Sequence, residues 1–249
     1  MFPRKYLETY RSPKKLIDQV FVGMWFDGSH KPRYEDIIRK SILAVGLEPY
    51  RVDLPRECDS IPITILEGIL NSRILLFEVS IISPENIKQK FRNANVMYEL
   101  GIAHAWRMPE EIIVIKEDDL NLPFDTATFR THKYDPKNEK ESTEKISSLI
   151  KSAKTEIDRT KSMLVEKAKN NLDEFCLSLI GHYKGHYFSY TPQPDPSLDI
   201  GSKLTIQRLL DLGLIWLHYD KGKYAYHWTE LGIDVTLSLG IEVVSENLW

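Results

Sequence analysis

The sequence predicts an α/β protein, a doubly wound parallel sheet of about five strands, followed by a long helix and a smaller α+β domain. Short apolar runs rich in β-branched residues alternate with segments whose apolar residues recur at helical spacing. This alternation is typical of βαβ units, whose strands run parallel. No Gly or Pro occurs between residues 138 and 180, which predicts the long helix.

Five runs have the length and composition of strands, and three helical segments separate them. The predicted strands are Gln19–Phe26, Leu47–Val52, Ile74–Val79, Glu111–Lys116 and Thr131–Tyr134. The predicted helices are Tyr34–Val45, ending at Gly46; Ile63–Asn71, opened by Pro62; and a segment with Asn95 as its N-cap. Residues 80–94 between them are predicted to form a polar loop with a basic tip at Lys88, Lys90 and Arg92, and residues 1–17 to form an arm.

Composition bounds the class of protein. With 249 residues, 42% hydrophobic, the chain is long enough for one large or two ordinary domains. Its net charge of −3 argues against a strongly basic surface, and its two cysteines suit a reducing compartment. No apolar run approaches the roughly 18 residues of a membrane span, and the N-terminus lacks a signal-peptide core. We therefore predict a soluble, cytoplasmic protein.

The third helix, within Asn93–Ala105, contains one carboxylate among apolar residues. Because apolar side chains occur on nearly every side, the sequence predicts a buried helix with Glu99 in its first turn. A buried carboxylate is costly unless it is paired, hydrogen-bonded or used chemically. Gly101 beside it would let a backbone or a ligand come close. The residues alone leave a structural acceptor and a functional carboxylate equally open.

Four motifs occur in order over residues 18–135: FVGMWFD at 21–27, RVD at 51–53, NVMYELGIAHA at 95–105 and LPFD at 122–125. In this order they resemble the nucleoside 2-deoxyribosyltransferase-like and TIR-like superfamily of bacterial proteins. The resemblance implies a flavodoxin-like sheet and makes the Glu of the Y-E-L-G run, Glu99, the catalytic carboxylate. The chain departs from the family pattern at Glu78, where Asp is usual, at Trp25, where Pro is common, and in a longer stretch at 83–95.

Polar residues follow the predicted strands where parallel strands place ligand sites, outside their carboxyl ends. There Glu99 could stabilise or attack an oxocarbenium-like C1′. Carboxylates could bind ribose hydroxyls and aromatic rings could stack on a base, whereas Arg51 could face a phosphate or simply pair with Asp53. The predicted substrate-binding residues are Trp25, Asp27, Arg51, Asp53, Glu78, Asn95 and Tyr98.

The resulting hypothesis is cleavage or transfer at the N-glycosidic bond of NAD or a (deoxy)nucleoside or nucleotide. No cofactor is predicted, and NAD enters only as one of these candidate substrates. The resemblance further implies a role in bacterial defence or stress signalling. A non-catalytic nucleotide-sensing module that controls association, and a DNA-binding regulator, are the alternatives. His182 and His186 are four residues apart, but nearby glycines and aromatics argue against a helical metal site, so no metal is predicted.

The C-terminal part is predicted to form a winged-helix-like domain. Ser202–Leu212 is a candidate helix ending at Gly213; a strand, a turn at 220–223 and a second strand follow, and Thr229 caps a last helix. The run from LLDLGLI to HWTELG is similar to the wing region of many bacterial winged-helix domains. The predicted domains are 1–137, a helical linker at 138–164 (one helix of about 60 Å over 138–180, or two broken near Thr160) and 165–249.

The charge of this domain distinguishes between a nucleic-acid partner and a protein partner. Residues 161–249 contain eight basic and eleven acidic side chains, whereas a DNA-binding wing normally has a basic surface. Only Lys203, Arg208, Lys221 and Lys223 would serve DNA binding. We therefore expect a protein partner or a homo-oligomer through this domain rather than nucleic acid.

Overall fold

The computed structural model describes residues 16–26, 30–52, 61–82, 91–122, 130–184, 200–220 and 223–244. The chain forms two compact units, Leu16–Asp158 and a second one that takes in the chain from Arg159 onward. The predicted division at residues 137 and 164 stays a prediction, and residues 1–15 of the predicted arm lie outside the described ranges.

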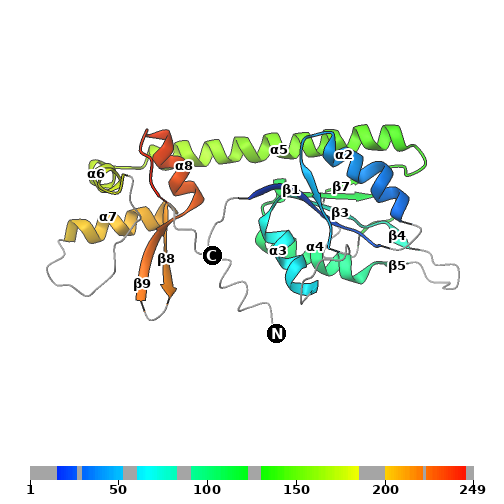
Figure 1. Cartoon of the computed structure of the whole chain (residues 1–249), viewed down its shortest axis with the longest axis horizontal. Helices are drawn as coiled ribbons and strands as arrows, with labels where there is room; N and C mark the ends of the chain where they lie inside the picture. Colours follow the sequence, from blue (N-terminus) through cyan, green and yellow to red (C-terminus); the bar gives the residue numbers. More distant parts are fainter. Residues whose placement is uncertain are drawn as a thin grey trace. The chain divides into compact units, whose positions relative to one another are not determined.

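The first unit contains a five-stranded, wholly parallel sheet (Figure 1). Its strands are β1 (Ile17–Gly23), β2 (Glu48–Tyr50), β3 (Ser72–Glu78), β6 (Ile112–Lys116) and β7 (Thr131–Lys133). They lie in the order β2-β1-β3-β6-β7, which confirms the predicted flavodoxin-like class. The chain leaves β1 toward β2 and then crosses to β3 on the other side, so the strand order reverses between β1 and β3.

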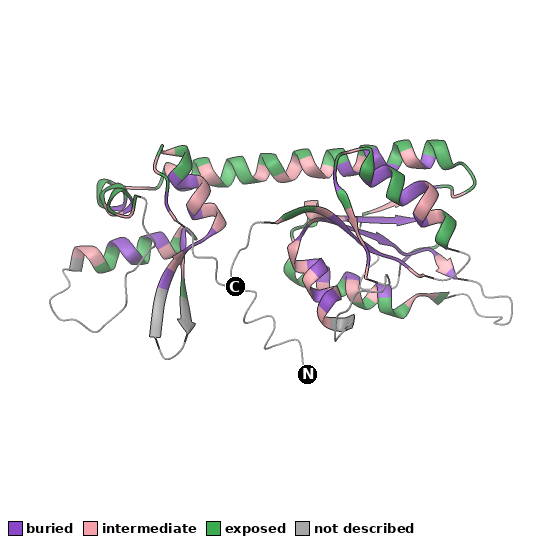
Figure 2. Ribbon diagram, viewed as in Figure 1, coloured by how far each residue is buried: buried purple, intermediate pink, exposed green. Residues whose placement is uncertain are grey.

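Helices cover both faces of this sheet (Figure 1). One face packs against η1 (Arg33–Ile38), α2 (Arg39–Leu43) and the first part of α5 (Glu139–Lys169), and the other against α3 (Ile61–Asn71) and α4 (Ala94–Trp106). Alternate side chains of β3 enter the two cores, as the period of a strand requires: Leu76 in the first, Leu75 and Phe77 in the second. The central strands are buried along most of their length (Figure 2).

The long helix differs from both predicted forms. α5 ends at Lys169, and α6 (Glu174–His182) begins after a break at residues 170–173, not near Thr160. Asp173 makes the second start possible, because its side chain accepts a hydrogen bond from the Cys176 amide (2.8 Å). Ile146 and Ile150 of α5 are fully buried against the sheet. This part of α5 therefore packs on the sheet of the first unit.

The predicted polar loop at residues 80–94 contains a short antiparallel hairpin, β4 (Ile81–Ile82) paired with β5 (Phe91–Arg92). The loop prediction was wrong for these four residues, and Lys88 and Lys90 lie outside the described ranges. A one-turn 3-10 helix, η2 (Pro109–Glu111), precedes β6. Among the described residues, no helix combines the length and hydropathy that a membrane span needs.

The second unit contains α6, α7 (Ile200–Asp211), β8 (Ile215–Asp220), β9 (Lys223–Trp228) and α8 (Glu230–Ser238). β8 and β9 pair as the predicted antiparallel hairpin. Gly213 follows α7 with a positive φ of 69°. Thr229 caps α8 as expected: its Oγ1 accepts from the Gly232 amide (2.9 Å) and donates to the Gly213 carbonyl (2.6 Å). These elements are confirmed, and the winged-helix interpretation of them stays a prediction.

Candidate functional site at the carboxyl ends of β1 and β3

The carboxylate of Glu99 lies at the carboxyl end of β1, beside the point where the strand order reverses. A Cβ atom placed on Gly23, the last residue of β1, would be 3.1 Å from Glu99 Oε2. Gly23 pairs in register with Phe77 of β3, whose ring lies against the same position. Ligands of doubly wound sheets bind outside the strand ends at this reversal. The one carboxylate of α4 is therefore at the place where the fold positions a ligand.

The start of α4 fixes where Glu99 falls. Asn93, not Asn95, is the N-cap: its side chain accepts hydrogen bonds from the amides of Asn95 (2.9 Å) and Val96 (3.2 Å). Glu99 therefore lies in the second turn, beyond the part of the helix where the dipole acts most strongly, and not in the first turn as predicted.

α4 is amphipathic in its burial although its sequence is apolar almost throughout. Val96, Leu100 and Ala103 are buried, whereas the Tyr98 side chain is 64% exposed. The prediction that α4 is buried on nearly every side is wrong, because the side of the helix that faces away from the sheet is exposed. No atom within the described ranges comes within 4 Å of a Cβ placed on Gly101, so nothing described there uses the space that this glycine leaves.

Glu99 is only partly exposed, and burial alone raises the pKa of its carboxyl to about 7. Within the described part of the chain, no hydrogen bond or ion pair reaches this carboxyl to offset the loss of solvent. A structural acceptor would be satisfied by neighbouring donors. Any donor to this carboxylate therefore lies outside the described residues or belongs to water or a ligand.

Asn95 and Tyr98 lie on the outer part of the same helix. Asn95 precedes Glu99 by four residues, so the two side chains share one face of α4. Both Asn95 and Tyr98 are exposed and point away from the core. The substrate-binding roles of Asn95 and Tyr98 stay predictions. The position of both residues, near Glu99 on α4, is compatible with these roles.

Glu78 lies on the opposite face of the sheet from Glu99. It ends β3 on the side of Leu76 and is 3% exposed. Its carboxylate accepts hydrogen bonds from the hydroxyls of Ser80 and Tyr134, the latter at 3.2 Å. Burial raises the pKa of Glu78, and the Ser80 hydrogen bond and the charge of Arg33 oppose that rise.

Glu78 therefore has the surroundings of a structural carboxylate. Ser80 Oγ accepts from the Glu117 amide (2.9 Å), and Arg33 pairs with Glu117 (3.0 Å), so the ends of β3 and β6 are joined to η1. The carboxyl ends of the parallel strands lie along one edge of the sheet, as predicted, but Glu78 and Glu99 are on opposite faces of the sheet. Sequence reasoning missed this because it did not assign the strand residues to faces.

Arg51 and Trp25 both contact neighbouring rings. The Arg51 guanidinium lies 4.2 Å from the ring centroids of Phe26 and Tyr34, and the residue is buried. The Trp25 ring lies 5.0 Å from that of His30. The Arg51 contacts belong to the Glu78 side of the sheet, since Phe26 and Tyr34 pack in that core. Asp27, Asp53 and the Pro123–Asp125 part of the LPFD motif lie outside the described residues.

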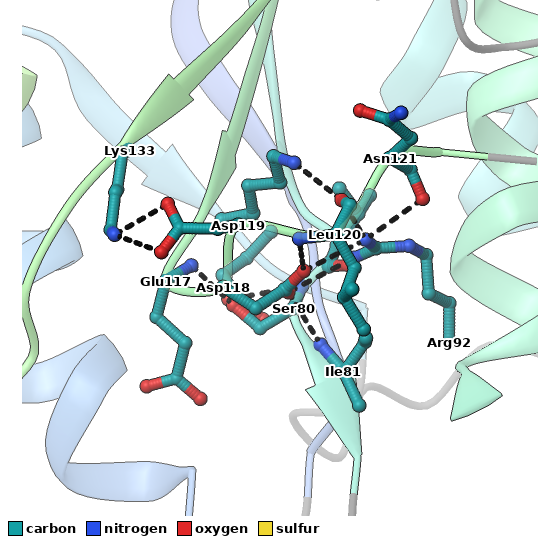
Figure 3. Close-up of polar contacts among 12 residues, drawn as sticks. Ser80, Ile81, Arg92, Glu117, Asp118, Asp119, Leu120, Asn121 and Lys133 are labelled. Carbon is teal, nitrogen blue, oxygen red and sulfur yellow. Dashed lines mark hydrogen bonds and ion pairs between the residues drawn. The ribbon is translucent and has the colours of Figure 1, made fainter. Parts of the chain in front are cut away.

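Arg92 is a positioning residue that the sequence did not reveal. Its side chain is 7% exposed, and its guanidinium pairs with Asp118 (2.9 Å) and donates to the carbonyls of Val79 and Leu120 (Figure 3). Asp118 also accepts from the Ile81 amide (3.0 Å). Burial opposes ionisation of Asp118, but these hydrogen bonds outweigh it and lower its pKa.

This network holds the β4–β5 hairpin against the segment after β6. Arg92 immediately precedes the Asn93 cap, so the network also fixes where α4 begins. Its basic neighbours in KQKFRNAN made Arg92 resemble a solvated charge, and nothing in the sequence points to Asp118 as its partner. Among the described residues, no group of His, Cys, Asp and Glu has the arrangement of a metal site, and His186 lies outside them.

No protein-family model matches the chain, and no curated protein matches it. Among solved structures, it is similar to the crystal structure of the TIR domain of the Toll-related receptor TRR-2 from Hydra magnipapillata. The sequence identity is 13% and the TM-score 0.39, and the match covers 54% of this chain and 97% of that chain. The fold class given above rests on the strand order and register, not on this likeness.

Proposed function

We propose that the first unit cleaves or transfers at the N-glycosidic bond of a nucleotide-like substrate, NAD or a (deoxy)nucleoside or nucleotide, with Glu99 as the catalytic carboxylate. The observation that carries the proposal is the place of Glu99: partly buried, without a described hydrogen-bond donor, at the reversal of strand order beside Gly23. A role in bacterial defence or stress signalling is the setting that the sequence resemblance adds.

The chemistry follows from what a carboxylate does beside a sugar. As the bond from C1′ to the base nitrogen breaks, its electron pair leaves with the base and C1′ becomes positive. The Glu99 carboxylate stabilises that charge or bonds to C1′ to give a glycosyl ester. Water or the nitrogen of a second base then attacks C1′ and loses its proton to the departed base or to solvent, which gives hydrolysis or transfer respectively. Where an ester had formed, the bond from Glu99 to C1′ breaks and the carboxylate is restored.

Ionisation matters for this role. With a pKa of about 7, roughly half of the Glu99 carboxyls are charged at neutral pH. Since only the carboxylate stabilises or attacks C1′, turnover is expected to rise as the pH increases through about 7.

The test is base release from NAD, NADP, nucleosides and deoxynucleotides by wild type and by Glu99→Gln. We expect release by wild type and a loss of at least about 100-fold in Glu99→Gln. Glu67→Gln, which changes a carboxyl of the neighbouring helix α3, is the control and should keep its activity. Equal turnover in wild type and Glu99→Gln would refute the assignment.

A nucleotide-sensing role without chemistry gives a different result in the same panel. It requires thermal stabilisation of wild type by one of these compounds, no base released, and a change in association when the compound binds. The two outcomes are exclusive for a given compound, so calorimetry beside the turnover assay distinguishes them.

We also propose that the second unit is a winged-helix-like module for association with protein rather than DNA. Phe175 of α6 and Leu204 of α7 are 73% and 65% exposed. Arg208, one of the few basic residues suited to DNA, pairs with Asp173 (2.8 Å) and donates to the Asn171 carbonyl. Sedimentation of the full chain with and without Leu204→Glu tests the proposal: we expect weaker association in the variant. DNA affinity that falls steeply with salt would contradict it.

A further inference from the structure

Gly23 has close neighbours on two sides, and neither leaves room for a side chain. A Cβ atom there would lie 2.5 and 2.7 Å from two ring carbons of Phe77, and 3.1 Å from Oε2 of Glu99. Carbon atoms that are not bonded normally stay beyond about 3.5 Å. Any residue other than glycine at this position must displace the Phe77 ring, and the Glu99 carboxylate must also give way by a few tenths of an ångström.

The two neighbours differ in how freely they move. Phe77 is fully buried in the core between β3 and α4, where its ring is enclosed. The Glu99 side chain reaches the strand end from α4, is partly exposed, and is held there by no described hydrogen bond. A methyl group on residue 23 must therefore shift the Phe77 ring or the backbone, and it also presses on the carboxylate, which is the freer of the two neighbours to move away.

We propose that Gly23 is the positioning residue for Glu99: because Gly23 has no side chain, the Glu99 carboxylate can occupy the space at the end of β1. The catalytic consequence rests on the function proposed above, whereas the placement of the carboxylate does not. The absence of a side chain at residue 23 therefore determines how closely the Glu99 carboxylate approaches the end of β1.

Gly68 of α3 provides a matched control. A Cβ atom there would lie 2.6 Å from the Phe21 ring and 2.7 Å from the Tyr50 ring, on the same face of the sheet. The crowding against aromatic rings is thus nearly the same as at Gly23. Among the three nearest atoms to that position there is no carboxylate oxygen. Gly68→Ala therefore reproduces the packing defect without the contact to Glu99.

The experiment compares Gly23→Ala with Gly68→Ala. The Glu99 carboxyl is titrated by carbon-13 NMR, with its resonance assigned by its absence in Glu99→Gln. In Gly23→Ala the carboxylate is displaced toward solvent, so we expect its pKa to fall by about half a pH unit. In Gly68→Ala it stays at about 7, as in wild type. Equal titration of Glu99 in the two alanine variants overturns the proposal.

A second variant keeps the test decisive if Gly23→Ala does not fold. Phe77→Leu removes part of the ring that the methyl meets, so Gly23→Ala/Phe77→Leu relieves the clash with the core but not the contact with Glu99. Its Glu99 carboxyl should still titrate lower than that of Phe77→Leu alone. If the two titrate alike, Gly23 only makes room for the ring and the proposal fails.

Turnover adds a readout that packing alone does not move. Relative to Gly68→Ala, Gly23→Ala should lower kcat about tenfold or more while KM changes little. The displaced carboxylate is no longer aligned with C1′, whereas the contacts that bind the substrate are kept. If wild type releases no base, the proposed function fails, and the titration still decides whether Gly23 positions Glu99.

Discussion

Glu99 destabilises the fold that positions it. Its carboxyl has a pKa of about 7 in the folded chain against an ordinary value of 4.5, with burial as the cause. The folded state therefore holds its proton where the unfolded state has lost it. The stability that this proton provides is fully present below pH 4.5 and is lost as the pH rises toward and through 7.

Replacing Glu99 by Gln should accordingly stabilise the protein at alkaline pH. At pH 8 we expect the free energy of unfolding of Glu99→Gln to exceed that of wild type by about 2–3 kcal/mol, since each pH unit of separation corresponds to about 1.4 kcal/mol. Near pH 4.5 the gain should disappear. Urea unfolding at the two pH values measures it; a gain independent of pH would mean that the charge of Glu99 is not the cause.

At the scale of elements, the Arg92–Asp118 network joins the hairpin before α4 to the segment after β6. The Arg92 side chain is 7% exposed and that of Asp118 18%, so the pair is partly shielded from water. Removing Arg92 leaves the partly buried Asp118 carboxylate with the Ile81 and Leu120 amides as its described donors.

Arg92→Ala should lower the free energy of unfolding by about 2–3 kcal/mol, because the hydrogen bonds of a charged, largely shielded group are lost. Lys133→Ala breaks the neighbouring pair with Asp119, whose members are 55% and 82% exposed, and should change it by less than about 1 kcal/mol (Figure 3). Denaturant unfolding of both variants gives the comparison. Similar losses in the two would show that the Arg92 pair is no more important than a surface pair.

Hydrophobic period and turn residues were sufficient to predict the five strands, the helices between them and the C-terminal hairpin, because each element carries its own pattern. The start of α4 was misplaced because Asn93 and Asn95 are equally good caps, and the choice depends on where Arg92 anchors the hairpin. The break at residues 170–173 was missed because no Gly or Pro marks it.

The site was predictable only in part. Glu99 was identified from its motif and from its setting in an apolar helix. Gly23 was not identified, because its role comes from a contact between residues 76 positions apart that meet only in the fold. For the same reason the sequence could not show that Glu78 and Glu99 face opposite sides of the sheet.

At the scale of the whole molecule, α5 supplies buried side chains to both units. Ile146 and Ile150 enter the core of the first, and Ala168 enters the core of the second. Such a helix is stabilised by the packing of its apolar face rather than by its own propensity.

Ile150→Ala should therefore lower the free energy of unfolding of the first unit by about 3 kcal/mol, because it opens a cavity beside the sheet. Lys151→Ala, on the exposed side of the same helix, should change it by no more than about 0.5 kcal/mol. Circular dichroism during denaturant titration measures both. An Ile150→Ala protein as stable as wild type would mean that α5 is dispensable to this core.

Both outer strands of the described sheet, β2 and β7, are only three residues long, and β2 contains Pro49 at its centre. Proline has no amide hydrogen to offer a neighbouring chain, and so short an edge gives a foreign strand little to pair with. Fibril growth by adding strands to this sheet is thereby discouraged. Copies of the chain that assemble are therefore expected to meet through side chains of helices or through the second unit rather than through this sheet.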